Sequence, residues 1–180
     1  MAGLVLAAGA GRRFGRPKAM VRWRGLTLVE HAVALLTDGG CDPVVVVLGA
    51  GAELVPELAA KTVLNREWAS GMGSSLRAGL AALPGTDVVV TLVDTPLLGP
   101  ESVRRLIRAG GQAAVATYGG DWGHPVLLGR AAAAEVARTA SGDRGARGWL
   151  RDNRGKVVAV PCDGTGDPRD VDVPDDLPEE

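Results

Sequence analysis

Residues 2–18 read AGLVLAAGAGRRFGRPK and join an apolar segment directly to a cationic, glycine-rich loop. The apolar run from Leu4 to Ala8 is long enough for a buried strand. Three glycines in the loop let backbone N–H groups approach a ligand closely, and four cations lie among them: Gly9, Gly11 and Gly15, with Arg12, Arg13, Arg16 and Lys18. This arrangement predicts a phosphate-binding turn at the carboxyl end of the first strand.

Two common phosphate-binding patterns do not fit the loop. The dinucleotide fingerprint GxGxxG requires a glycine at position 14, which is Phe14, and Gly15 comes one residue too late. The next strand, predicted at Val44 to Leu48, is followed by Gly-Ala-Gly and by no acidic residue that could hold a ribose. A P-loop is also excluded because no Gly-Lys-Ser/Thr follows. Arginine and lysine among glycines suit a triphosphate better.

The bulk composition predicts one soluble domain over residues 1–180. Hydrophobic residues make up 46% and charged residues 23% of 180 residues, which is typical of a folded chain with a core. The net charge of −1 argues against the broad basic face that nucleic-acid binding needs. No uncharged apolar run approaches transmembrane length, and Cys41 and Cys162 are too far apart for a CxxC zinc motif. We expect a cytoplasmic protein without a membrane or nucleic-acid partner.

Strands and helices alternate along the chain. The hydrophobic patterns predict strands at 4–8, 44–48, 62–64, 87–93, 113–117 and 157–160, and helices at 26–38, 52–60, 101–109, 131–139 and 146–152. A further helix follows Ser75, and the segment 119–128 reads as a loop with a short strand. Thr27 and Glu30 have the spacing of a capping box. The pattern predicts an α/β fold of three layers with a mostly parallel sheet, with ligands at the carboxyl ends of the strands.

Two further loops are expected at that edge of the sheet. Gly71 to Ser75 opens a helix with glycines and serines, which suits an anion or the edge of a base, although this stretch taken alone favours ordinary N-capping by Ser74. Asp94 follows a buried strand, where a carboxylate suits Mg²⁺ beside phosphate, although an Asp before Thr-Pro also initiates turns. His124, between Gly123 and Pro125, could place an imidazole near the site, but a lone His in a loop is more often a hydrogen-bonding surface residue, and we assign it no acid/base role. The acidic segment from Asp163 reads mostly as a solvated tail.

Six motifs in order resemble one family over nearly the whole chain. They are LAAGAGRRFGRPK (6–18), NREWASGMGSSLRAGL (65–80), LVDTPLL (92–98), GHPVLL (123–128), GDRGARGWL (142–150) and DVDVPDDL (170–177). Together they resemble the molybdenum cofactor nucleotidyltransferases, or MobA-like NTP transferases, and in particular their cytidylyltransferase branch. The resemblance implies a Rossmann-like nucleotidyltransferase fold. It also implies Mg²⁺ and transfer of a nucleotidyl group from an NTP to the terminal phosphate of molybdopterin, with release of pyrophosphate.

The resemblance also implies roles for individual residues. Arg13 and Lys18 match the positions that hold the phosphates, and Asp94 matches the metal-binding Asp, so these three are the expected catalytic residues. Asp170 and Asp172 match paired polar positions that are expected to complete the metal site. The expected nucleotide-binding residues are Leu6, Ala7, Ala8, Gly9, Gly11, Arg13, Lys18, Gly73 and Ser75.

Some details of the substrates stay open. Ala8 gives LAAG, as in the cytidylyl branch, where the guanylyl branch has LAGG, so CTP is favoured over GTP. Val93 and Thr95 depart from the family, which more often has Gly before the Asp and Gln or Met after it, and this departure affects the acceptor. A sugar phosphate as acceptor and a non-catalytic accessory protein therefore remain alternatives. A molybdoenzyme or its chaperone would be a further partner.

Overall fold

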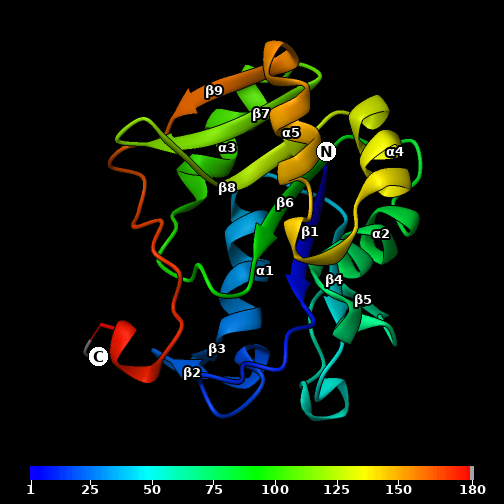
Figure 1. Ribbon diagram of the computed structural model, residues 1–180. Coiled ribbons are helices and arrows are strands. Elements are labelled where there is room, and N and C mark those ends of the chain that lie inside the picture. Colours follow the sequence, from blue (N-terminus) through cyan, green and yellow to red (C-terminus); the bar gives the residue numbers. More distant parts are fainter. Residues whose placement is uncertain (179–180) are drawn as a thin grey trace.

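The computed structural model describes residues 1–178, which form three layers around a seven-stranded sheet (Figure 1). The sheet has the order β5-β4-β1-β6-β8-β7-β9. Its strands are β1 (Ala2–Ala7), β4 (Val44–Leu48), β5 (Lys61–Leu64), β6 (Val88–Leu92), β7 (Ala113–Tyr118), β8 (Asp121–Leu128) and β9 (Val157–Pro161). The helices are α1 (Leu28–Asp38), α2 (Met72–Ala81), α3 (Pro100–Ala109), α4 (Arg130–Thr139) and α5 (Arg147–Asp152). This architecture confirms the predicted Rossmann-like α/β class.

The sheet is mostly parallel, as predicted. Strands β5, β4, β1 and β6 pair in parallel, and so do β7 and β9, whereas β8 is antiparallel to both β6 and β7. From β1 the chain moves outward through β4 to β5 and then returns to β6 on the other side of β1. The strand order therefore reverses between β1 and β6, and in open α/β sheets ligands bind at such a point, beyond the carboxyl ends of the strands.

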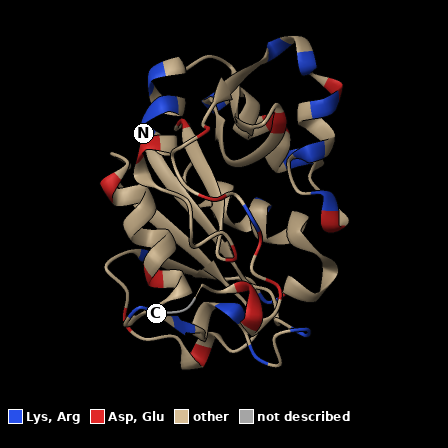
Figure 2. Cartoon of the chain, turned by 90° about the vertical axis from the view of Figure 1, so that its left-hand side faces the viewer, with Lys and Arg blue, Asp and Glu red and all other residues tan. Residues whose placement is uncertain are grey.

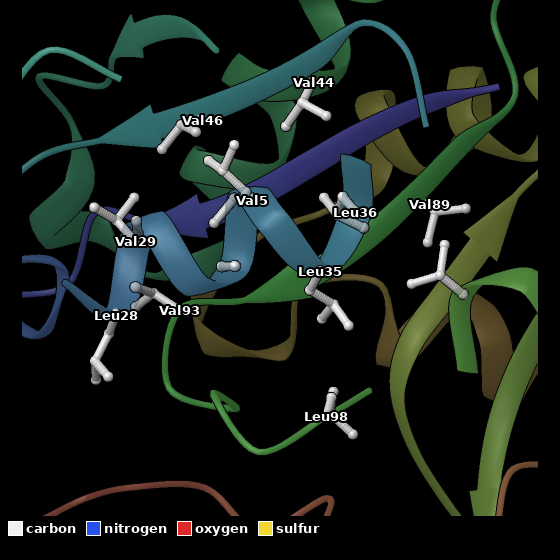
Figure 3. Packing of buried hydrophobic residues seen from close by; sticks show 14 of the residues in the cluster. Val5, Leu28, Val29, Leu35, Leu36, Val44, Val46, Val89, Val93 and Leu98 are labelled. Carbon is white, nitrogen blue, oxygen red and sulfur yellow. The ribbon is translucent and has the colours of Figure 1, made fainter. Parts of the chain in front are cut away.

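Continuous apolar strands explain the two helical layers. Strands β1, β4 and β6 contain no charged residue and are buried along their whole length, as strands covered on both faces must be. Helices α1 and α3 contribute to the core on one face, and α2, α4 and α5 to the core on the other. Figure 3 shows α1 across the sheet, with Val29 and Leu36 on the side of the helix toward the strands. Strands β1 and β6 are thereby held between two hydrophobic cores, one on each face of the sheet, and the loops that follow them start from fixed positions.

Three predicted elements differ from the structure. Leu26–Thr27 is a short strand, β3, that pairs with β2 (Arg22–Trp23) around a turn with positive φ, and α1 starts only at Leu28. The predicted helix 52–60 is a 3₁₀ turn of three residues, because a proline at 56 disfavours helical geometry in the residue before it. The segment 119–128, predicted as a loop with a short strand, is a tight hairpin turn at Gly119 and Gly120, both with positive φ, followed by the long strand β8.

The predicted capping box lies at the start of helix α1. Thr27 is its N-cap, the Thr27 side chain accepts a hydrogen bond from the Glu30 N–H, and the Glu30 carboxylate accepts one from the Thr27 N–H. This capping box is confirmed. It fixes the point at which the chain, having formed the glycine-rich loop, turns into the first covering helix.

The acidic C-terminal segment is largely exposed, as its charge suggests, but it packs against the sheet edge and is not a free tail. It returns from β9 past the carboxyl ends of the strands to the two-stranded ribbon of β2 and β3 (Figure 1). Val171 is fully buried, and its N–H donates to the Asp94 carbonyl at 2.8 Å. The Trp23 indole N–H donates to the Pro178 carbonyl at 3.1 Å. Burial of apolar residues within the segment outweighs its overall charge, and the segment brings Asp172 to the sheet edge.

Charged residues lie mostly on helices and loops around the uncharged strands β1, β4 and β6, with both signs interspersed (Figure 2). Within residues 1–178, no helix has both the length and the apolar character needed to cross a bilayer. Cys41 and Cys162 are both free and buried.

Candidate active site

A cavity of about 560 Å³ opens where β1 and β6 end. Its walls come from the glycine-rich loop after β1, the segment that leads into α2, the turn after β6 and the C-terminal segment. The lining residues are Leu6, Ala8, Gly9, Ala10, Gly11, Arg12, Arg13, Lys18, Trp68, Ala69, Gly71, Met72, Ser75, Leu92, Val93, Asp94, Asp143 and Asp172. Most of the predicted nucleotide-binding residues therefore share one cavity. Ala7 and Gly73 lie outside the lining, because Ala7 belongs to the core beneath β1 and Gly73 packs against the backbone of Ser141.

The glycine-rich loop has its shape because of Gly11. This residue has φ of +59°, and a Cβ on it would lie 2.0 Å from the Arg16 carbonyl oxygen. The close approach folds the loop back on itself, so that Lys18 begins a short 3₁₀ helix beside the cavity. Gly9 has no atom within 4 Å of an added Cβ, so that its backbone borders open space. Backbone N–H groups in such a loop are available to an anion.

Two cations and two carboxylates meet on the cavity wall. The Lys18 ammonium donates to Asp94 Oδ2 at 3.0 Å and to Asp172 Oδ1 at 2.7 Å. Arg13 forms an ion pair with the other oxygen of Asp172. The Lys18 side chain is only 13% exposed, whereas that of Arg13 is 76% exposed. The structure thus brings together Arg13, Lys18, Asp94 and Asp172 from three separate parts of the sequence.

The pKa values of Lys18 and Asp172 both favour the ionised forms at neutral pH. Burial lowers the pKa of Lys18, but the hydrogen bonds and charges of Asp172 and Asp94 outweigh burial, so that this pKa lies above its ordinary value. The hydrogen bond from Lys18 and its charge hold the pKa of Asp172 below its usual range. As two cations balance two carboxylates, the cluster is neutral as a whole. A triphosphate can bind the cations only if another positive charge compensates the carboxylates.

The predicted metal ligands do not gather into a single group. Among residues 1–178, no three His, Cys, Asp or Glu side chains are placed to hold one metal ion. Asp94 Oδ1 is nevertheless buried without a hydrogen-bond partner in this part of the chain. Asp170 lines a neighbouring cavity, where burial and the charge of Asp94 raise its pKa. Since Mg²⁺ takes one or two carboxylates together with phosphate oxygens and water, Asp94 with Asp172 fits such an ion.

The entrance to α2 differs from an ordinary capped helix. Gly71 is the N-cap, and Ser74 does not cap the helix, because its hydroxyl donates to the Glu67 and Gly71 carbonyls. Asn65 is buried and donates to the hydroxyl oxygens of Ser74 at 2.8 Å and Ser75 at 3.0 Å. This network fixes the loop from the inside and leaves Ser75 on the cavity wall. The interpretation of Ser74 as an ordinary N-cap is therefore wrong.

The unusual residues around Asp94 have different positions. Val93 lines the cavity, whereas Thr95 is 3% exposed and lies in neither cavity. The Thr95 hydroxyl donates to the Leu92 carbonyl at 3.1 Å and so closes the turn after β6. Thr95 is therefore a structural residue of the turn, and Val93 alone of the two departures faces the ligand space.

A second cavity of about 250 Å³ adjoins the first. The two share Leu6, Met72, Leu92, Asp94 and Asp143, and the second has an apolar floor. Its other lining residues are Leu76, Val90, Val115, Trp122, Gly123, His124, Val126, Arg144, Ala146, Arg147, Leu150 and Asp170. The motifs GHP (123–125) and GDRGAR (142–147) supply several of these lining residues, but neither motif by its sequence alone indicates a particular ligand. Trp68, Met72 and Asp143 in the first cavity, and Trp122 and Arg147 in the second, were not predicted.

His124 occupies an irregular part of β8. The register with β7 shifts from Val115–Val126 to Ala116–Gly123, which leaves His124 and Pro125 outside the ladder. Burial lowers the pKa of His124, although the backbone of Val90 and the charge of Asp94 act in the opposite direction. The ring is therefore neutral at pH 7. The prediction of a surface loop residue is wrong, because a bulge places His124 against a cavity.

Comparison with known proteins identifies the family. The sequence model of the MobA-like NTP transferase domain matches residues 3–158. Nicotine blue oxidoreductase of Paenarthrobacter nicotinovorans is 41% identical over 94% of this chain and 91% of its own. The molybdenum cofactor guanylyltransferase of Rhodobacter capsulatus is 32% identical over 98% and 93%. The manganese complex of Rv0371C from Mycobacterium tuberculosis has a TM-score of 0.81 and 30% identity, over 97% of this chain and 94% of the other. Fold, cavity and sequence agree, and the chain belongs to the MobA-like NTP transferase family.

Proposed function

We propose that this chain transfers a nucleotidyl group from an NTP to the terminal phosphate of a molybdopterin-type acceptor and releases pyrophosphate. The observation that carries the proposal is the cavity at the ends of β1 and β6, where Arg13 and Lys18 meet Asp94 and Asp172 beside the glycine-rich loop. The relative named molybdenum cofactor guanylyltransferase supports the acceptor. The first cavity would hold the NTP, and the adjoining second cavity would hold the acceptor.

The proposed mechanism needs no strong general base. The acceptor phosphate is already an anionic nucleophile, so that the barrier comes from bringing two anions together and from charge on the departing pyrophosphate. Lys18 and Arg13 would neutralise the triphosphate, which requires both to give up Asp172 as a partner. The two adjoining cavities would set the acceptor phosphate in line with the nucleotide, and such positioning supplies a large share of catalysis.

A divalent cation, Mg²⁺ in our proposal, fits the carboxylates that Lys18 and Arg13 would release. Asp94 would bind it through the oxygen that has no partner among the described residues, together with Asp172, and Asp170 lies at the neighbouring cavity. When bound, the ion would stabilise negative charge on the phosphates. The manganese complex of the related Rv0371C supports the use of a divalent metal.

We propose CTP as the preferred nucleotide. Ala8 is 5% exposed and lines the first cavity, and the LAAG sequence around it resembles the cytidylyl branch. The guanylyltransferase names among the relatives make GTP the main competitor. We further propose that residues 1–180 act as one cytoplasmic domain and deliver the product to a molybdoenzyme or its chaperone.

A screen of four NTPs tests the proposal. The purified chain is incubated with molybdopterin, Mg²⁺ and each NTP, and pyrophosphate release is measured. Release that is fastest with CTP is expected, whereas release only with GTP would reverse the nucleotide preference. Release only with a sugar phosphate in place of molybdopterin would support the first alternative, and nucleotide binding without release would support an accessory protein.

The substitution Asp94→Asn tests the metal-binding role. It keeps the size of the side chain and removes its charge, so that Mg²⁺-dependent pyrophosphate release should fall by at least about 100-fold. The control is Asp121→Asn, at the exposed start of β8, which should leave the rate unchanged. Circular dichroism should show the same fold in both variants. Substantial Mg²⁺-dependent activity in Asp94→Asn would refute the role of Asp94.

The relative named nicotine blue oxidoreductase favours a second candidate function, reduction of an organic dye-like compound. The apolar floor of the second cavity and Trp122 beside it suit such a flat molecule. The glycine loop lacks the dinucleotide fingerprint, which counts against a nicotinamide donor. The same preparation should be assayed for oxidation of NADH or NADPH with nicotine blue. Turnover there without pyrophosphate release would establish the second candidate instead of the first.

A further inference from the structure

Two buried polar atoms without partners lie on residues of the second cavity. Within residues 1–178, Asp94 Oδ1 and His124 Nδ1 are both buried and lack a hydrogen bond. Asp94 and His124 both line the second cavity. Buried polar groups in proteins are nearly always paired, so that each exception needs an explanation. Asp94 has one in the proposed metal ion, but His124 has none in the function proposed so far.

The hydrogen-bonding role of the free nitrogen follows from the other side of the ring. A hydrogen bond with the Val90 backbone raises the pKa of His124, and a bond with that effect is one that the ring donates. Because Nδ1 has no partner, the hydrogen bond with Val90 is assigned to Nε2. In the neutral ring one nitrogen donates and the other accepts. Nδ1 therefore presents a lone pair, which calls for an N–H or O–H donor.

The residues that line the cavity around His124 indicate what kind of ligand it would bind. The floor of the second cavity is aliphatic, and Trp122 adds an aromatic face from the same strand. Arg144 and Arg147 line the same cavity together with the carboxylates of Asp94, Asp143 and Asp170, so that its polar wall carries both signs of charge. A flat, largely apolar ring with a hydrogen-bond donor on its edge fits these features.

We propose that His124 determines specificity for the acceptor: its Nδ1 accepts a hydrogen bond from an N–H or O–H group on the edge of the acceptor's heterocycle. This inference rests on the proposed nucleotidyl transfer and adds the residue that recognises the ring. In this arrangement the ring of the acceptor lies against Trp122 and His124. Its phosphate extends toward Asp94, which both cavities share.

Kinetics with substitutions of the two histidines test the proposal. His124→Phe removes the acceptor nitrogen, and the KM for molybdopterin should rise roughly 10-fold to 100-fold while the KM for the NTP changes less than about twofold. The matched control is His31→Phe, at the chain's other histidine. His31 lies in α1, where its Nε2 pairs with the Trp23 carbonyl at 2.8 Å, and its substitution should leave the KM for molybdopterin unchanged. His124→Asn, whose amide oxygen can take the place of Nδ1, should recover most of the affinity.

A binding measurement separates this inference from the proposed reaction. Pterin-6-carboxylate, a flat heterocycle with donors and a negative charge, is titrated while tryptophan fluorescence is followed. Weaker binding to His124→Phe than to wild type and to His31→Phe supports the inference even if no pyrophosphate is released. Equal binding to all three, or no binding to wild type, overturns it. If His124→Phe does not fold, His124→Gln replaces it, because its longer side chain cannot place an oxygen at Nδ1.

Discussion

At the scale of single residues, two glycines in the same loop have different duties. Gly11 and Gly15 both have positive φ, +59° and +79°, which side chains rarely adopt. A Cβ on Gly11 would also meet the Arg16 carbonyl, whereas one on Gly15 would meet no atom within 4 Å. Both glycines thus share a left-handed backbone conformation, but only at Gly11 does the absence of a side chain allow the Arg16 carbonyl to come close and shape the glycine-rich loop.

Alanine substitutions at Gly11 and Gly15 should separate the cost of the left-handed backbone conformation from the cost of steric overlap with the Arg16 carbonyl. Gly15→Ala should lower the free energy of unfolding by roughly 1–2 kcal/mol, which is the cost of left-handed geometry alone. Gly11→Ala should cost at least about 1 kcal/mol more and should also weaken NTP binding, because the loop has to open. Urea unfolding and nucleotide titration give both quantities. Equal losses in the two variants would show that the overlap at Gly11 is relieved without cost.

At the scale of single elements, glycine in a helix also depends on its surroundings. Gly79 in α2 lies so close to the sheet that an added Cβ would be 2.4 Å from a methyl of Leu4 and 2.9 Å from one of Val47. Gly148 in α5 has no atom within 4 Å of an added Cβ. Helix propensity favours alanine at both positions, but packing opposes it at Gly79 only.

Alanine at these two helix positions should therefore act in opposite directions. Gly148→Ala should raise the free energy of unfolding by up to about 1 kcal/mol. Gly79→Ala should lower it by about 1–3 kcal/mol, because α2 is pushed away from β1 and β4. Thermal unfolding of the two variants provides the comparison. Stabilisation by Gly79→Ala would mean that α2 can shift away from the sheet at little cost.

At the scale of the whole molecule, the C-terminal segment links distant parts of the chain. Val171 is fully buried, whereas Val173 two residues later is 37% exposed. Asp172, between them, pairs with Lys18 and Arg13, and its N–H donates to Asp176 Oδ2 at 2.8 Å. Burial of one valine therefore holds a carboxylate of the site in place.

Serine at the two valines tests this link. Val171→Ser should lower the free energy of unfolding by roughly 2 kcal/mol and should also weaken NTP binding, because a buried apolar side chain is replaced by a polar one next to Asp172. Val173→Ser should change stability by less than about 0.5 kcal/mol. Thermal unfolding and nucleotide titration are run on both. Unchanged nucleotide affinity in Val171→Ser would show that Asp172 holds its position without this anchor.

The free energy of unfolding of the whole molecule should fall at alkaline pH because of Cys41. Burial raises the pKa of this thiol from 9.0 to about 11. As pH rises, the thiol therefore loses its proton in the unfolded chain before it does so in the folded protein. The contribution of Cys41 to the free energy of unfolding is complete below pH 9 and is lost as pH rises toward 11. The loss should reach roughly 2–3 kcal/mol, and Cys41→Ala should flatten the pH dependence over this range. Urea unfolding between pH 8 and 11 measures it; parallel curves for both proteins would contradict the assignment.

Local sequence determined much of this protein, because continuous apolar runs such as Val44–Leu48 have to be buried on both faces, and because Thr27 and Glu30 suffice to begin a helix. The same holds for the glycine-rich loop, whose glycines and cations lie in a few adjacent residues. Tertiary structure alone decided that Asp172 pairs with Lys18, 154 residues away, and that Val171 is buried within an acidic segment. It also decided that a bulge in β8 sets His124 against a cavity. These features depend on which surfaces meet after the sheet has formed, and the free energy of such long-range contacts has no signature in the neighbouring residues.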